Sequence, residues 1–190
     1  VTDFEGMARL TADRDAVVHL AAIPGPSNHS GPEVLRVNVA GTWNVFEAAA
    51  QAGVRRVVQA GSINAFGCFW GVVDLPHVTH FPIDEAHPTY TTDPYSFSKE
   101  LIERVGDYYW RREGIASVAL RLPWVHPADH HVSESHRDRM RRARTMLDEL
   151  AAMDADRRRR RIAAVAEKAR AWRRRRPFEP LLVEHEHIAP

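Results

Sequence analysis

Several features that would assign a chain to a special class are missing from this sequence. Cys68 is its only cysteine in 190 residues, so an internal disulfide is excluded and a reducing cytoplasm is the simplest location. No apolar run reaches the roughly 20 residues that cross a bilayer, and no signal peptide is visible, so we expect no membrane partner. The length and the 44% hydrophobic content suit one domain of good size.

Basic charge is scarce in the first two thirds of the chain and abundant after it. Residues 1–136 carry 10 Lys/Arg against 16 Asp/Glu, whereas residues 137–176 carry 16 against 6. Apolar residues at helical spacing predict two Arg-rich helices over 136–153 and 157–176. We interpret 128–190 as a solvated helical insertion or extension; a surface for a polyanion or an acidic partner is the alternative.

Aromatic and metal-ligating patterns are also sparse in this region. Trp172 is the only aromatic residue of the two predicted helices, so stacking on bases is not indicated and we do not expect a nucleic-acid partner. Histidines occur near residues 126–136 and 185–187, but their spacing is not typical of a metal site, so we expect no bound metal.

The first 127 residues alternate strand-like and helix-like patterns. Short apolar runs at 15–22, 56–62 and 117–122 are typical of buried parallel strands. Helical spacing precedes the first run at 4–10 and separates the others, from Pro32 to about Gly53 and from about Asp93 to Gly114. This order predicts an α/β fold with a parallel sheet, whose ligand site lies beyond the carboxyl ends of the strands.

Tyr95 and Lys99 are four positions apart in the last of these helices, which places them on one face. Free tyrosine titrates near pH 10, but a neighbouring ammonium and a helix N-terminus both favour the phenolate. The spacing therefore predicts that Lys99 lowers the pKa of Tyr95, so that Tyr95 exchanges a proton with a substrate hydroxyl. An ordinary amphipathic helix is the alternative interpretation.

Several separate stretches, taken in order, resemble the extended short-chain dehydrogenase/reductases of the NAD(P)-dependent epimerase/dehydratase family. The resemblance covers roughly residues 1–127. It rests on His19-Leu20-Ala21-Ala22, Val37-Asn38-Val39-Ala40-Gly41-Thr42-Trp43-Asn44, Gly61-Ser62-Ile63-Asn64-Ala65-Phe66-Gly67, Asp84-Glu85 with Pro88, Tyr95 with Lys99, and Arg121-Leu122-Pro123-Trp124. The family's order and spacing are kept throughout.

The resemblance implies a Rossmann-like, doubly wound parallel sheet, truncated at its N-terminus, within residues 1–127. It implies NAD or NADP as cofactor, with Tyr95 as general acid/base, Ser62 hydrogen-bonded to the substrate oxygen and Lys99 on the nicotinamide ribose. The implied cofactor contacts are Leu20, Ala21, Ala22, Asn38, Tyr95, Lys99 and Pro123. The candidate substrate contacts are Ser62, Asn64, Tyr95 and Trp124.

Three of the polar candidates also have a plainer interpretation. Ser62 can be a strand-end cap, Asn38 a buried helix residue bonded to backbone, and Asn64 a simple loop residue. We interpret His19 as structural. The family often dimerises through helices that would include Asn44 and Tyr108, so a homodimer is a further expectation.

Departures from the family pattern narrow the expected reaction. Ile63 and Asn64 stand where related dehydratases and decarboxylases carry a carboxylate, so we do not expect elimination or decarboxylation. Trp124 stands where nucleotide-sugar epimerases typically have an asparagine that helps to hold the diphosphate. We expect a dehydrogenase or reductase acting on a small alcohol or carbonyl, such as a free sugar or sugar acid. The alternatives are a nucleotide-sugar epimerase and a non-catalytic module whose Arg-rich helices bind a polyanion or protein.

The family's glycine-rich phosphate-binding turn is absent. None of the 10 glycines follows the Gly-x-Gly-x-x-Gly spacing that places a pyrophosphate at a helix N-terminus. The chain also begins with Val1 directly before a helical pattern, as a cut end would. We therefore expect part of a longer protein that, by itself, binds a dinucleotide weakly or not at all and is inactive.

Overall fold

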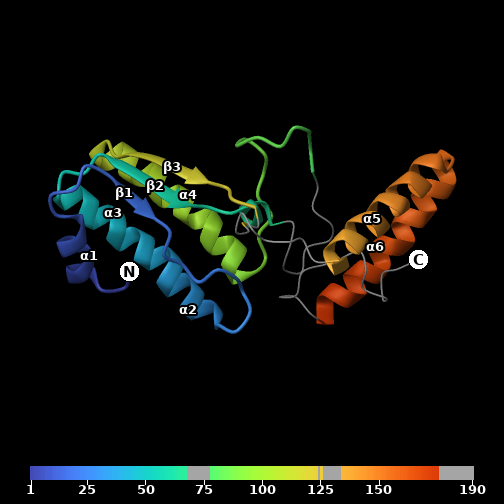
Figure 1. Ribbon diagram of the computed structural model, residues 1–190, viewed down its shortest axis with the longest axis horizontal. Coiled ribbons are helices and arrows are strands. Elements are labelled where there is room, and N and C mark those ends of the chain that lie inside the picture. The colour runs from blue at the N-terminus through green and yellow to red at the C-terminus, as the bar shows by residue number, and fades with distance from the viewer. Residues whose placement is uncertain (68–77, 124, 126–133, 176–190) are drawn as a thin grey trace.

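The computed structural model describes residues 1–67, 78–123, 125 and 134–175 (Figure 1). In chain order the elements are α1 (Phe4–Thr11), β1 (Val17–His19), α2 (Gly31–Leu35), the π-helix η1 (Arg36–Ala40), α3 (Gly41–Gln51), β2 (Arg56–Ala60), the 3-10 helix η2 (Ile63–Phe66), α4 (Pro94–Glu113), β3 (Ala116–Leu120), α5 (Glu134–Ala152) and α6 (Ala155–Arg175). The alternation of strands and helices over the first 120 residues confirms the predicted α/β class.

The three strands form one parallel sheet in the order β1-β2-β3. Val18 of β1 pairs with Val58 of β2, which pairs with Val118 of β3. Because all three strands point the same way, their carboxyl ends meet at one edge, as the sequence predicts. This edge positions the candidate site.

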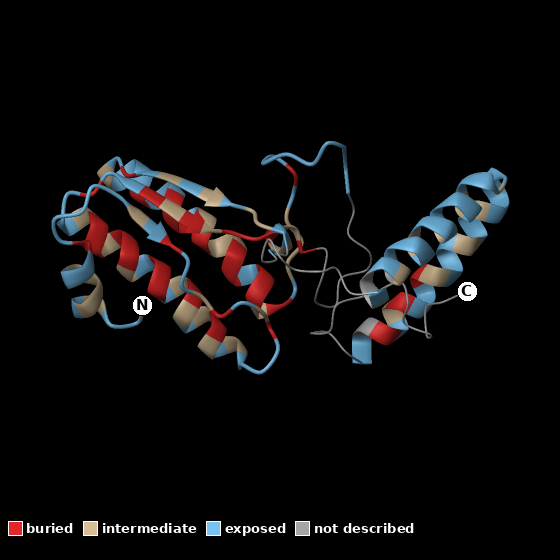
Figure 2. Cartoon of the chain, viewed as in Figure 1, coloured by how far each residue is buried: buried red, intermediate tan, exposed pale blue. Residues whose placement is uncertain are grey.

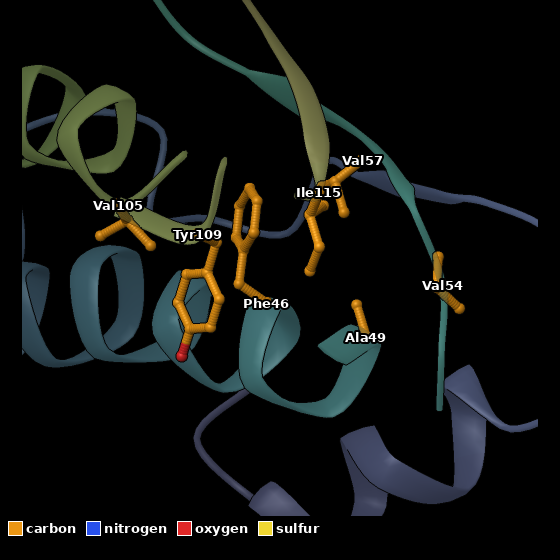
Figure 3. Close-up of a cluster of buried hydrophobic side chains, with 7 residues drawn as sticks. All are labelled: Phe46, Ala49, Val54, Val57, Val105, Tyr109 and Ile115. Atoms are coloured by element: carbon orange, nitrogen blue, oxygen red, sulfur yellow. The ribbon is translucent and has the colours of Figure 1, made fainter. Parts of the chain in front are cut away.

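Helices α3 and α4 cover one face of the sheet (Figure 1). Between them and the sheet lies a core of side chains that are at most 7% exposed: Phe46, Ala49, Val54, Val57, Val105, Tyr109 and Ile115 (Figure 3). The Phe46 and Tyr109 rings stack with centroids 5.3 Å apart, which fixes α3 against α4. The Tyr109 hydroxyl leaves this core to donate a 2.6 Å hydrogen bond to Glu47.

The opposite face of the sheet is open in the part of the chain that the structure describes (Figure 2). Val18 and Val118, which both pair with Val58, are 66% and 54% exposed, and Leu120 is 47% exposed. Side chains alternate between the two faces of a strand, so His19, next to Val18, and Val57, next to Val58, are buried on the face that the helices cover.

The predicted helix from Pro32 is continuous to Gln51, but it contains the π-helical turn η1. The Ser30 side chain caps its start, and Gly53 follows its end with a φ of +74°. A π-turn inserts one residue into the helical repeat and is frequent at functional sites. Here it carries Asn38, which is 1% exposed.

The two predicted Arg-rich helices are present as α5 and α6, which lie side by side (Figure 1). Arg158 joins them, because its guanidinium donates to the carbonyl oxygens of Leu150, Ala151 and Met153 at the end of α5. These bonds satisfy carbonyl groups that a helix end leaves without partners. Of the helices that the structure describes, none has both the length and the apolar character needed to cross a membrane.

Candidate active site

The candidate site lies at the carboxyl edge of the sheet. There the ends of β1 and β2 meet α4 and the π-turn around a small recess, which we call the carboxyl-edge hollow. It is lined by His19, Leu20, Ala21, Ala22, Asn38, Thr42, Ala60, Lys99 and Ile102. Five of the seven implied cofactor contacts therefore come together in one place. Of the other two, Tyr95 lies on α4 with Lys99, and Pro123 is exposed after β3.

The sequence builds α4 so that Tyr95 and Lys99 face inward. The Asp93 side chain caps the helix by accepting from the Ser96 N–H at 2.9 Å, and Pro94 occupies the first turn. The helix ends at Gly114, whose φ of +67° suits a C-terminal glycine. Tyr95 and Lys99 are 7% and 4% exposed, so the predicted shared face is the buried face.

Ser62 joins the turn after β2 to Tyr95. Its Oγ accepts from the backbone N–H of Asn64 at 3.1 Å and from Asn64 Nδ2 at 3.2 Å, so Ser62 caps η2. Ser62 also hydrogen-bonds the Tyr95 hydroxyl, an interaction that lowers the Tyr95 pKa and so favours the phenolate. Ser62 therefore caps the turn after β2, as the plainer interpretation holds, and it also contacts Tyr95; its bond to a substrate oxygen stays a prediction.

Lys99 does not act on Tyr95 as the sequence predicts. Its Nζ donates to the Ala60 carbonyl at 2.6 Å and lies 5.8 Å from the centroid of the Tyr95 ring. Burial raises the pKa of Tyr95 above its ordinary value, and the hydrogen bond from Ser62 offsets this only in part. The overall shift is therefore opposite to the lowered Tyr95 pKa that the sequence predicts, because desolvation of the phenolate outweighs the bond from Ser62. Burial also lowers the pKa of Lys99, to about 8.

Asn38 ties three parts of the site together. Its Oδ1 accepts from the Ile23 N–H at 2.8 Å, and its Nδ2 donates to the Ile23 carbonyl at 3.1 Å. The same Nδ2 donates to Ser98 Oγ at 2.9 Å, and Ser98 in turn donates to the Tyr95 carbonyl at 2.7 Å. Asn38 thus connects the loop after β1 to the helix that carries Tyr95 and Lys99.

His19 belongs to the same network through Thr42. The Thr42 hydroxyl donates to the Asn38 carbonyl at 2.6 Å, so its oxygen must accept the 3.0 Å bond from His19 Nε2. This pattern assigns the proton of neutral His19 to Nε2. Burial, together with the charge of Lys99, lowers the His19 pKa from 6.5 to about 4.

Acidification is expected to destabilise the fold through His19. Because the His19 pKa is about 4 in the fold and near 6.5 when unfolded, the unfolded chain binds more protons between these values. The free energy of unfolding should fall as the pH drops from 6.5 to 4, by on the order of 3 kcal/mol. Urea denaturation at several pH values measures this loss.

His19→Gln is the matched control for that experiment, because glutamine keeps an N–H donor for Thr42 and does not titrate. The variant should lose much less stability over the same pH interval. Equal pH dependence in the two proteins would show that His19 is not the responsible group.

The remaining predicted residues divide between the described and undescribed parts of the chain. Asn64 contacts Ser62, while its Oδ1 has no hydrogen-bond partner among the described residues. Trp124 lies outside the described residues, as do most of the histidines considered for metal. No group of three potential metal ligands occurs in the described residues.

Two residues of the network escape sequence reasoning. Thr42 lies four positions after Asn38, a helical spacing that offers a weak signal. Ser98 is sixty positions from its partner Asn38, and nothing in the sequence joins them.

Comparison with known proteins assigns the chain to a family. The model of the NAD dependent epimerase/dehydratase family matches residues 1–170. The chain belongs to this family. The match extends beyond residue 127, past the stretches on which the sequence resemblance rests and into the Arg-rich helices.

Members of the family with known activity resemble the chain over about two thirds of its length. L-arabinose 1-dehydrogenase (NAD(P)(+)) of Haloferax volcanii is 34% identical over 135 residues, which are 68% of this chain and 52% of that protein. UDP-glucose 4-epimerase of Homo sapiens is 30% identical over 127 residues, which are 62% of this chain and 32% of that protein. The chain thus spans about half or less of the length of these relatives.

A solved member of similar structure is MoeE5 in complex with UDP-glucuronic acid and NAD. It is 30% identical, with a TM-score of 0.55, over 71% of this chain and 44% of that protein. The likeness supports the Rossmann-like architecture that the family resemblance implies.

Proposed function

We propose that the protein is an NAD(P)-dependent oxidoreductase that transfers hydride at a hydroxyl or carbonyl carbon of a small sugar-like or alcohol substrate. The observation that carries the proposal is the hydrogen-bonded pair of Ser62 and Tyr95 beside a buried Lys99, at the carboxyl edge of a parallel sheet. Two hydroxyls directed at each other next to an ammonium suit proton exchange with one substrate oxygen.

The chain's own residues divide the proton chemistry between them. Tyr95, whose pKa is raised by burial, is a phenol at neutral pH and donates a proton to a carbonyl oxygen that is being reduced. In the reverse direction its oxygen accepts the proton of the substrate hydroxyl. Ser62 donates a hydrogen bond to that oxygen and stabilises the charge that develops there.

The residues that line the carboxyl-edge hollow suit the nicotinamide-ribose end of a dinucleotide by their chemistry. Lys99 has three ammonium protons, and its hydrogen bond within the described residues goes to Ala60, which leaves donors for ribose hydroxyls. Leu20, Ala21 and Ala22 present an apolar wall beside it. When bound, NAD(P) would supply the hydride chemistry. The pyrophosphate end has no glycine-rich turn within these 190 residues.

A dehydrogenase of free sugars is favoured over a nucleotide-sugar epimerase. The L-arabinose dehydrogenase is 34% identical over 135 residues, whereas the human epimerase is 30% identical over 127 residues, and Trp124 stands where nucleotide-sugar epimerases typically have an asparagine. The alternative, a nucleotide-sugar epimerase, is supported by the likeness to MoeE5, which binds UDP-glucuronic acid.

A homodimer is a further part of the proposal, because the rings of Trp43 of α3 and Tyr108 of α4 stack with centroids 5.1 Å apart and the two residues are 40% and 37% exposed. Light scattering would test it, a mass of one chain contradicting the dimer.

The decisive assay follows NAD(P)H formation by the full-length gene product with L-arabinose, glucuronate and UDP-glucose. We expect net reduction of NAD or NADP with a free sugar or a uronate. Interconversion of UDP-glucose without net reduction would favour the epimerase. Absence of turnover and of cofactor binding, with salt-sensitive binding to heparin, would favour a module that acts through α5 and α6.

A further inference from the structure

One side chain next to Lys99 makes contacts that the proposed chemistry does not use. Glu100 follows Lys99 on α4, and its two carboxylate oxygens each accept a hydrogen bond from a different threonine. Thr89 donates to Oε1 at 2.8 Å and Thr91 donates to Oε2 at 2.7 Å. We call these three residues the Glu100 clamp. All three are half-buried, where such charge-assisted bonds are worth more than at the surface.

Tyr90, the residue between the two threonines, is held by a contact with η2. The Tyr90 N–H donates to the Phe66 carbonyl of η2 at 3.0 Å. Gly67, which ends η2 with a φ of +78°, lies so close to this segment that a Cβ would come within 2.2–2.5 Å of Tyr90 and Thr91 backbone atoms. Only glycine allows this approach.

Further contacts stabilise the same part of the structure, around Phe66 of η2. The His87 ring meets the Phe66 ring edge-on with centroids 5.4 Å apart, and the Arg121 guanidinium lies 4.4 Å from the centroid of the Phe66 ring. Arg121 is itself held by two bonds to Glu103 of α4, at 2.8 and 2.9 Å. The segment that contains Thr89 and Thr91 thus contacts both η2 and α4.

These two elements carry the two reactive hydroxyls, since Ser62 caps η2 and Tyr95 lies in the first turn of α4. We propose that Glu100 is a positioning residue: the clamp holds residues 87–91 against Phe66 and Gly67 at the end of η2, and this fixed segment orients the substrate between Ser62 and Tyr95. This inference rests on the proposed function, and it adds a residue that touches neither reacting atom.

Three variants of the full-length gene product separate positioning from general stability. Glu100→Leu removes both acceptors at similar volume. Thr89→Val combined with Thr91→Val removes both donors at nearly constant shape, and Thr89→Ser with Thr91→Ser restores them. Asp107→Asn, an exposed acidic position on the same helix, is the matched control.

Hydrogen exchange and steady-state kinetics are then measured on each variant. In Glu100→Leu and in the double threonine-to-valine variant, we expect exchange in residues 87–91 to become about tenfold faster and KM for the sugar substrate to rise about tenfold. KM for NAD(P) should change less than twofold. The double threonine-to-serine variant and Asp107→Asn should behave as the parent. Combining Glu100→Leu with the two valine substitutions should add little beyond either change alone, because both break the same clamp.

The outcomes are distinguishable. Unchanged exchange would show that the clamp does not hold the segment, and faster exchange with unchanged KM would show that the segment does not orient substrate; either result overturns the inference and leaves the proposed function standing. No turnover by the parent protein on any substrate, with or without faster exchange, overturns the proposed function and the inference together.

Discussion

Tyr95→Phe is expected to lower kcat of the full-length gene product by about 10²–10⁴-fold, the usual contribution of a positioned general acid or base. The substitution removes one oxygen and keeps the ring that packs with Ile23 and Val34. Because Ser62 remains, the substrate oxygen keeps one donor but loses its proton partner. Steady-state kinetics with saturating NAD(P) measure the loss, and removal of the bond to Ser62 should reduce stability by no more than about 1 kcal/mol.

Tyr109→Phe is the matched control, because it removes a buried hydroxyl from the same helix at a distance from the site. Tyr109 donates to Glu47, so its loss should reduce stability by about 1 kcal/mol and leave kcat nearly unchanged. If Tyr95→Phe retained kcat within threefold of the parent, Tyr95 would not be the proton donor.

Asn38→Leu is expected to lower the free energy of unfolding by about 4 kcal/mol, a large effect for one substitution. The leucine would remove three buried hydrogen bonds and leave the Ile23 N–H and C=O without their partner. Denaturation by urea, with the slope checked for two-state behaviour, gives the value.

Asn44→Leu provides the comparison for that experiment. Asn44 lies six positions later in the same continuous helical stretch but makes one half-buried hydrogen bond, to the Val1 carbonyl. Its replacement should cost no more than about 1 kcal/mol. Equal small losses in the two variants would mean that Asn38 does not hold the loop after β1 to α4.

The fold could be predicted because local sequence signals mark most of its helices and strands. The end of α4 at Gly114 and the alternation of short apolar runs with helical spacing are direct sequence signals. The boundaries of β1 were less accurate: the predicted run of 15–22 contains a strand of only three residues, Val17–His19. Leu20, Ala21 and Ala22 leave the strand and line the hollow, a role that an apolar sequence does not distinguish from pairing.

The site could be predicted where it depends on helical geometry and not where it depends on the balance of opposing energies. The shared face of Tyr95 and Lys99 follows from their spacing of four. The raised pKa of Tyr95 does not, because it depends on how deeply Tyr95 is buried and on its hydrogen bond with Ser62. The clamp and the bond from Asn38 to Ser98 join side chains through tertiary packing, for which the sequence holds no periodic signal.

The most direct test of hydride transfer at this site uses a sugar or uronate deuterated at the carbon to be oxidised. The full-length gene product is incubated with this substrate and NAD or NADP, and the cofactor is examined for deuterium at C4 of the nicotinamide. We predict that the label appears in the reduced cofactor and that Tyr95→Phe slows its appearance by about 10²–10⁴-fold. A folded protein that transfers no label to either cofactor would contradict the account.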